Sequence, residues 1–418
     1  MYNFLKGRLI IVRLCLLATA LVLVAIGIAT IYAVGNPAEL SPASQTGNLA
    51  NLWKKQLIFA AISFVGFIAV NLVNYRRLGA LSFPIFALLL LLLGILLLGR
   101  YVVNIPFVPE INGAHRWIRF KIAGWQLPAV QPSELCKLGY VLALAWYLRY
   151  RSNYRNFSAL IGPFILTLLP MVLILLEPDL GTVVLMMPIL FTMLFVAGAK
   201  VKHLLIIVAM ALLVSPLLWH KMKPYQRTRI SSVLLQSSWI RQQAEQNQAW
   251  GEILVGKKFN AKQWKNDWGY HLIRSKFAVA SGGIDHGKGY GFRRGPFIKY
   301  NFLPERHNDF VFAIIAHQWG FGGCLGLLML YVIIIGCGLE IAMNNTDPFG
   351  RLLAIGIVAV FTVEVLVNVS MTVGLMPITG LTLPLVSYGG SSLLVSMASV
   401  GLLNNVGRRR PFSVAPKT

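Results

Sequence analysis

The chain of 418 residues alternates between long apolar stretches and short polar connections. A helix that crosses a bilayer needs about 20 mainly apolar residues. Ten stretches meet this requirement, so the pattern predicts an all-α polytopic integral membrane protein with about ten transmembrane helices and a large extracytoplasmic loop. The predicted spans are residues 11–33, 54–73, 79–98, 132–149, 158–176, 180–198, 203–219, 310–338, 349–376 and 387–405.

Basic residues at the ends of these stretches predict the orientation of the chain. With ten spans, the basic clusters all fall on one side, which the positive-inside rule makes cytoplasmic. Both termini are therefore expected inside. The apolar run near the N-terminus is longer than the roughly 7–15 residues of a signal peptide, so we expect it to be retained. The clusters are Lys6/Arg8, Arg76/Arg77, Arg149/Arg151/Arg155, Lys200/Lys202 and Arg408/Arg409/Arg410.

Two extracytoplasmic segments lie between the predicted spans, residues 100–131 and residues 220–309. The second is too long for a simple connection, and its 16 basic, 6 acidic and several Trp residues predict amphipathic pieces on the membrane face. We expect a membrane domain of seven spans (1–219), the large loop (220–309), and three last spans with a cytoplasmic tail (310–418). A positive outer face suits a lipid diphosphate; bulk anionic lipid is the alternative.

Composition narrows the class of protein. With 56% hydrophobic and 12% charged residues, the chain does not resemble an ordinary soluble domain. Its net charge of +24 is expected to meet membrane lipids and not nucleic acid, because the chain is so apolar. The four cysteines show no metal-ligand spacing and are expected to be core residues.

Charged residues inside apolar spans are candidates for function, because each costs about 3 kcal/mol to insert. Glu134 and Lys137 share a face of the fourth span and are expected to neutralise each other. Removing one should then be worse than removing both. Arg116, upstream, is available to a carboxylate or phosphate. Asp179 follows the helix-breaking Pro178 and is expected to cap the next helix.

The large loop carries a second group of candidates. They comprise 266–271 around Asp267, a glycine-rich run at 281–291, and the charged run 302–310 at the mouth of a span. The glycines do not follow a strand, so a nucleotide loop is a weak interpretation and a platform for a sugar or diphosphate is favoured. The run from Glu305 to Asp309 fits either catalysis or an interfacial salt-bridge cluster.

Four motifs, in this order, resemble the SEDS family (shape, elongation, division and sporulation proteins) along nearly the whole chain. Residues 303–307 and 274–283 are more similar to the RodA branch than to the FtsW branch. The motifs are Pro132-Ser133-Glu134, Glu177-Pro178-Asp179-Leu180-Gly181, Leu303-Pro304-Glu305-Arg306-His307, and Thr379-Gly380 continuing through Pro384-Leu385-Val386-Ser387-Tyr388-Gly389-Gly390-Ser391-Ser392.

The resemblance implies a peptidoglycan glycosyltransferase of cell elongation and cell shape in the bacterial cytoplasmic membrane, with its site outside. It implies lipid II and the growing glycan strand as substrates and a class B penicillin-binding protein as partner. No cofactor is certain, although a divalent cation (Mg²⁺ or Mn²⁺) shared with the diphosphate fits the chemistry. A lipid flippase or transporter, or a scaffold for a penicillin-binding protein, are the alternatives.

The same resemblance implies roles for individual residues. Asp267 is expected to be the general base, with Asp285 as the fallback because the spacing after Asp267 departs from the family. Arg116 and Lys137 would stabilise the diphosphate, and no role is assigned to 317–319, where the family usually has acidic residues. The predicted substrate-binding residues are Arg116, Glu134, Lys137, Asp179, Glu305, His307 and Ser387.

Overall fold

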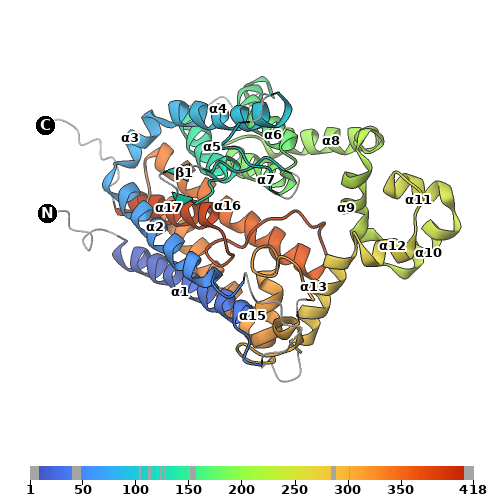
Figure 1. Ribbon diagram of the computed structural model, residues 1–418. Helices are drawn as coiled ribbons and strands as arrows, with labels where there is room; N and C mark the ends of the chain where they lie inside the picture. Colours follow the sequence, from blue (N-terminus) through green and yellow to red (C-terminus); the bar gives the residue numbers. More distant parts are fainter. Residues whose placement is uncertain are drawn as a thin grey trace, which may run out of the picture.

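The computed structural model describes residues 9–39, 49–102, 105–111, 114–119, 121–122, 125–126, 128–150, 157–283, 289–300 and 302–408. Figure 1 shows a bundle of long helices with a smaller lobe at one end. The start of the first helix and the end of the last lie together at the opposite end, where Arg13 Nε donates to Asn404 Oδ1 at 2.9 Å. Outside the described residues lie Asp285 and the basic residues Lys6, Arg8, Arg151, Arg155, Arg409 and Arg410.

Each predicted span corresponds to a helix, which confirms the predicted fold class. In the described ranges, six helices are long and apolar enough to cross a membrane by those measures alone. The remaining four are short (α7), apolar over part of their length (α8), or more polar (α5, α17). The ten are α1 (Ile10–Gly35), α2 (Leu52–Leu72), α4 (Ser82–Tyr101), α5 (Pro132–Leu148), α6 (Ile161–Leu176), α7 (Leu180–Val196), α8 (Val201–Lys221), α15 (Val311–Met343), α16 (Pro348–Val373) and α17 (Gly390–Arg408).

Helix α16 occupies the centre of the bundle and is the most buried of the six apolar spans. It packs against α5, α7 and α15, while α17 packs along α2 (Figure 1). Because lipid tails are as apolar as leucine, close packing holds such helices together rather than exclusion from water. Short elements connect them: α3 (Tyr75–Ala80), the 3₁₀ helix η1 (Phe157–Leu160), and an antiparallel pair of two-residue strands, β1 (Lys121–Ile122) and β2 (Trp125–Gln126).

Local sequence fixes the helix ends that matter for the site. Pro132 is in the first turn of α5, where its missing N–H leaves no bond unmade. Asp179 is the N-cap of α7, as predicted, with its Oδ1 accepting from the Thr182 N–H at 3.4 Å. Gly374 ends α16 at φ +88°, a left-handed conformation that glycine adopts without steric cost.

The large loop folds into helices, and only part of it forms the lobe seen beyond α8 in Figure 1. Helices α9 to α12 share a small core that includes Leu235, Val255 and Trp264. Helices α13 and α14 instead contribute to a core with the start of α15, around Phe310. The bounds are α9 (Pro224–Leu234), α10 (Ser238–Gln246), α11 (Gln248–Val255), α12 (Ala261–Asn266), α13 (Tyr270–Ser281) and α14 (Pro296–Lys299).

Candidate active site

The turn between α6 and α7 is the first part of the site. Asp179 is buried, and its Oδ2 accepts from Ser133 Oγ at 2.8 Å and Gln131 Nε2 at 3.2 Å. It also accepts from the hydroxyl of Thr182 at 3.0 Å. Besides capping α7, Asp179 therefore ties the start of α5 to the start of α7.

Arg116 reaches the same turn from the segment before α5. Its Nε donates to the backbone oxygen of Glu177 at 3.0 Å, and its Nη2 donates to the backbone oxygen of Pro178. A guanidinium has five N–H donors in a fixed fork, so these two bonds orient it and leave other donors for a ligand. The structure thus brings together Arg116 and Asp179, two of the predicted binding residues.

Asp309 lies at the mouth of α15 and was not assigned a role from sequence. Its carboxyl is half-buried, and burial, together with the charges of Glu305 and Asp179, raises its pKa to about 7. Two cations, Arg116 and Arg229, oppose that rise. A carboxyl with a pKa near neutral pH is suited to accept a proton, so Asp309 is a candidate base within the charged run for which the sequence analysis weighed catalysis without assigning a residue.

The backbone around Asp309 is held by groups from α16 and the loop that follows it. Asn368 Nδ2 donates to the Asp309 carbonyl at 3.0 Å and to the Leu381 carbonyl at 2.6 Å. Gly380 sits at φ +77°, and a Cβ built there would lie 3.5 Å from Asp309 Oδ2. A side chain at position 380 would be strained and would face the carboxyl, so glycine keeps the approach to Asp309 open.

Glu177 lies in the turn between α6 and α7, two residues before Asp179. Only 1% of the residue is exposed, and neither carboxyl oxygen has a hydrogen-bond partner within the part of the chain that the structure describes. Burial, with the nearby charge of Asp179, raises its pKa to about 9. Glu177 is therefore a neutral acid at pH 7.

Lys137 is buried within the helix bundle, although its predicted role is to stabilise the diphosphate. Its Nζ lies 2.8 Å from Glu134, which confirms the predicted pair, and 2.5 Å from Glu364 of α16. The Lys137 side chain is 2% exposed. Glu364 stands alone in the apolar run of α16, and that signal, an ionisable residue inside a span, was available in the sequence.

The other predicted residues surround the mouth of α15. Glu305 is exposed and accepts from Asn308 Nδ2 at 2.7 Å. The His307 ring packs against Tyr388, with centroids 5.6 Å apart, and burial lowers its pKa. The buried Ser387 hydroxyl donates to the Asn308 carbonyl at 2.7 Å and accepts from the Leu383 N–H at 2.8 Å. Ser387 thus joins the loop before α17 to the segment that carries Asp309.

Asp267 lies further out, at the C-terminal end of α12, and its side chain is exposed. Among the described residues, its carboxylate accepts no hydrogen bond and forms no ion pair. Asp267 is linked electrostatically to Glu305 through His271. Burial lowers the pKa of His271, and the charges of Glu305 and Asp267 both oppose that fall. The His271 ring is parallel to that of Phe310, with centroids 6.2 Å apart. The catalytic role of Asp267 stays a prediction.

Fold and site together define a polytopic membrane enzyme whose polar cluster lies where the loops meet the helix ends. The family model for cell cycle proteins of the FtsW, RodA and SpoVE type matches residues 13–411. The chain belongs to this family, which confirms the predicted resemblance, and members similar to it are named peptidoglycan glycosyltransferases. It is accordingly a peptidoglycan glycosyltransferase, the predicted class of enzyme.

Individual relatives show how far the likeness extends. The peptidoglycan glycosyltransferase RodA of Treponema pallidum is 32% identical over 443 residues, covering 94% of this chain and 97% of that protein. MrdB of Escherichia coli K12, also named a peptidoglycan glycosyltransferase, is 33% identical over 300 residues, 72% of each chain.

Two solved structures have the same fold. A chain in a structure described as the structural coordination of polymerization and crosslinking by a peptidoglycan synthase complex is 31% identical, with a TM-score of 0.70 and coverage of 94% of this chain and 96% of that one. The rod shape determining protein RodA of Thermus thermophilus is 28% identical, with a TM-score of 0.59 and coverage of 94% and 95%.

Proposed function

We propose that this chain polymerises lipid II into glycan strands for cell elongation, with its active site on the extracytoplasmic side of the bacterial cytoplasmic membrane and both termini inside. The observation that carries the proposal is the half-buried Asp309 carboxyl, with its pKa near 7, which feels the positive charges of Arg116 and Arg229. Glycosyl transfer needs a base for the attacking hydroxyl and positive charge for the departing diphosphate. The surroundings of Asp309 supply both.

In this mechanism Asp309 takes the proton from the 4-hydroxyl of the acceptor sugar. The oxygen then bonds to the anomeric carbon of the donor, and the bond from that carbon to the diphosphate oxygen breaks. The diphosphate leaves with the electron pair, and Arg116 and Arg229 offset its developing charge. Asp267, the base expected from the family resemblance, is the competing candidate, and its side chain is exposed at the end of α12.

In this proposal, other predicted residues hold the helices and loops of the site in position. Lys137 and Glu134 join α5 to α16, and Ser387 holds the loop before α17 against the segment that carries Asp309. Their predicted contact with substrate stays untested. In the described part of the chain no group of three His, Cys, Asp or Glu residues is arranged to hold a metal. Mg²⁺ or Mn²⁺ would therefore fit only as an ion shared between a carboxylate such as Asp309 and diphosphate oxygens.

A class B penicillin-binding protein is the proposed partner. Support comes from the structure of a peptidoglycan synthase complex that couples polymerization to crosslinking, which contains a chain of the same fold. Crosslinking of glycan strands is a transpeptidase reaction, and this chain shows no nucleophile arrangement of that kind among the residues described in its site. A partner would supply it.

The decisive test of the proposed function is polymerisation of purified lipid II by the detergent-purified chain, with and without a fused class B partner. Polymer that is absent with Asp309→Asn supports the proposal. A flippase would move lipid across vesicles without making polymer, and a scaffold would make none even with the wild-type sequence. Either result with active partner and intact substrate would contradict the proposal.

A further inference from the structure

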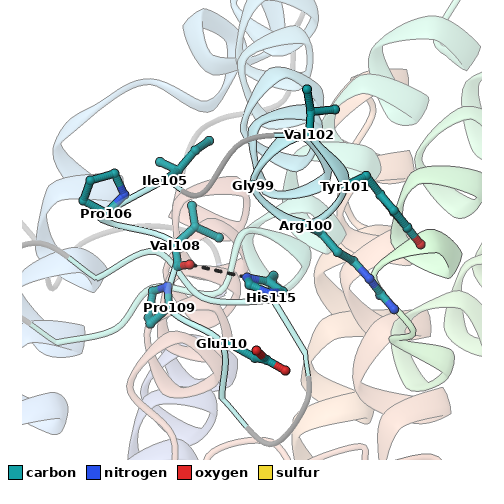
Figure 2. A pocket seen from close by; sticks show the side chains of 10 residues that line it. All are labelled: Gly99, Arg100, Tyr101, Val102, Ile105, Pro106, Val108, Pro109, Glu110 and His115. Carbon is teal, nitrogen blue, oxygen red and sulfur yellow. Dashed lines mark hydrogen bonds between the residues drawn. The ribbon is translucent and has the colours of Figure 1, made fainter.

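A cavity of about 470 Å³ lies at the end of α4 (Figure 2). Arg100 and Tyr101 line it from α4, and Pro106, Pro109, Glu110 and His115 line it from the segment that follows. This volume is within the range of about 300–1,000 Å³ that small-molecule sites occupy. None of these residues has a place in the mechanism above.

The cavity shares a wall with the active site. Arg100 Nη1 donates to the Leu176 carbonyl at 2.8 Å, and Arg116 Nε donates to the next carbonyl, that of Glu177, at 3.0 Å. His115, which lines the cavity, directly precedes Arg116 in the chain. The two arginines thus hold adjacent carbonyls where α6 ends. A ligand that extends past Arg116 would enter the cavity next.

The lining suits a ligand that is polar and uncharged. Arg100 and Glu110 carry opposite charges, and no ion pair joins them within the described residues, so each is available to a ligand. The His115 ring is oriented by Nδ1, 3.4 Å from the Val108 carbonyl (dashed in Figure 2). Sugar hydroxyls both donate and accept hydrogen bonds, which calls for the mixture of an arginine, a carboxylate and a histidine.

The aromatic and proline side chains of the cavity offer apolar surfaces on which a sugar ring can pack. The Arg100 guanidinium lies over the Tyr101 ring, 5.1 Å from its centroid. Tyr101 is 63% exposed, so its ring offers an apolar face with a polar tip. Pro106 and Pro109 form the facing side in Figure 2. Sugar rings have apolar C–H faces that pack on such surfaces.

We propose that this cavity is a saccharide subsite, which binds a sugar unit next to the one that reacts at Asp309. The inference rests on the proposed function, because it places the remainder of the same substrate. A diphosphate or an anionic headgroup would meet the Glu110 carboxylate, and an acyl chain would bury that carboxylate without a partner. The sugar unit belongs either to the lipid-linked donor or to the growing strand.

Binding of a lipid-free peptidoglycan tetrasaccharide to the full chain in nanodiscs tests the subsite directly. We expect Tyr101→Ala and Glu110→Gln each to weaken the affinity about tenfold, the effect of roughly 1.4 kcal/mol at 25 °C. Tyr150→Ala is the matched control, because Tyr150 is 76% exposed and lies outside the cavity. It should change the affinity less than twofold. Unchanged affinity in both cavity variants, with normal thermal stability, would overturn the proposal.

The same binding assay separates this inference from the proposed function. Asp309→Asn should bind the tetrasaccharide as well as wild type while making no polymer, because Asp309 does not line the cavity. If Asp309→Asn polymerises normally and only the cavity variants lose binding, the base is misplaced and the subsite stands.

Kinetics of the cavity variants then distinguish the two sources of the sugar. If the cavity binds the donor, the cavity variants should show a raised KM for lipid II even in the joining of two lipid II molecules. If it binds the growing strand, they should join two molecules normally but extend a preformed glycan poorly. Either pattern supports a saccharide subsite. Normal kinetics in both assays would contradict it.

Discussion

The ammonium of Lys137 lies 2.5 Å from the Glu364 carboxylate, a contact that spans 227 positions in the sequence. With Glu134 at 2.8 Å on its other side, one cation meets two carboxylates in the bundle core. Removing one partner of a buried ion pair typically costs about 3–5 kcal/mol, because an unpaired charge remains. Because Lys137 has two carboxylate partners, the effect of each substitution on stability depends on all three residues.

Lys137→Met should be the most destabilising single change in this group, since it leaves two buried carboxylates together. The sequence alone predicts that replacing Glu134 and Lys137 together recovers the yield. The structure predicts that this double variant stays unstable, because Glu364 is left unpaired. Adding Glu364→Gln should recover it. The thermal stability of the variants in detergent can be monitored by size-exclusion chromatography. Full recovery of stability in the double variant would show that Glu364 is not a partner of Lys137.

The pH dependence of polymerisation should report the carboxyl of Asp309. Burial raises its pKa to about 7, and the base acts when deprotonated, so the rate should rise with pH, reach half its maximum near pH 7 and level off above about pH 8. At pH 6 it should be about a tenth of the maximum. Glu305→Gln removes a charge that raises this pKa, so the midpoint should move to lower pH. A flat profile between pH 5.5 and 8 would exclude Asp309 as the base.

Glu177 should make the protein less stable as pH rises. Its pKa of about 9 in the folded chain exceeds the usual 4.5, so its full contribution is present below pH 4.5 and is lost as pH rises toward 9. Glu177→Gln removes this loss. The variant should match wild type near pH 5 and exceed it at pH 8 by at least about 1 kcal/mol, as judged by thermal unfolding. A variant less stable than wild type at pH 8 would contradict the assignment.

Orientation in the membrane is testable independently of activity. A reporter near Gln263, in α12, should be outside the cell, whereas reporters near residue 155 and at the C-terminus should be inside. A cytoplasmic signal near Gln263 would place Asp309 and the whole candidate site on the wrong face for a reaction on extracytoplasmic lipid II.

The spans and the Asp179 cap could be predicted from the sequence because both depend on local signals. Apolar length identifies a span, and an acidic residue after a helix-breaking proline identifies a cap. Glu364 was also visible as an ionisable residue within the apolar run of α16, but its partner was not, because no local pattern pairs residues 227 positions apart.

Asp309 illustrates the limit more sharply. Its identity and position at the mouth of α15 were evident, but its pKa depends on burial and on charges from three other segments, at Asp179, Arg116 and Arg229. Those segments meet only in the folded chain. The family resemblance points to Asp267 instead, and the sequence does not reveal that its side chain is exposed at the end of α12.

Polymerisation of lipid II by Asp309→Asn and Asp267→Asn, purified in parallel, distinguishes the two candidate bases. Both variants should fold, insert and bind the partner as wild type does; Asp267 is exposed, and such a substitution usually costs less than about 0.5 kcal/mol. Loss of a general base typically lowers a rate by about 10²–10⁴. We expect Asp309→Asn to make no detectable polymer, while Asp267→Asn stays within a fewfold of wild type. The reverse result would contradict this expectation and return the base to Asp267.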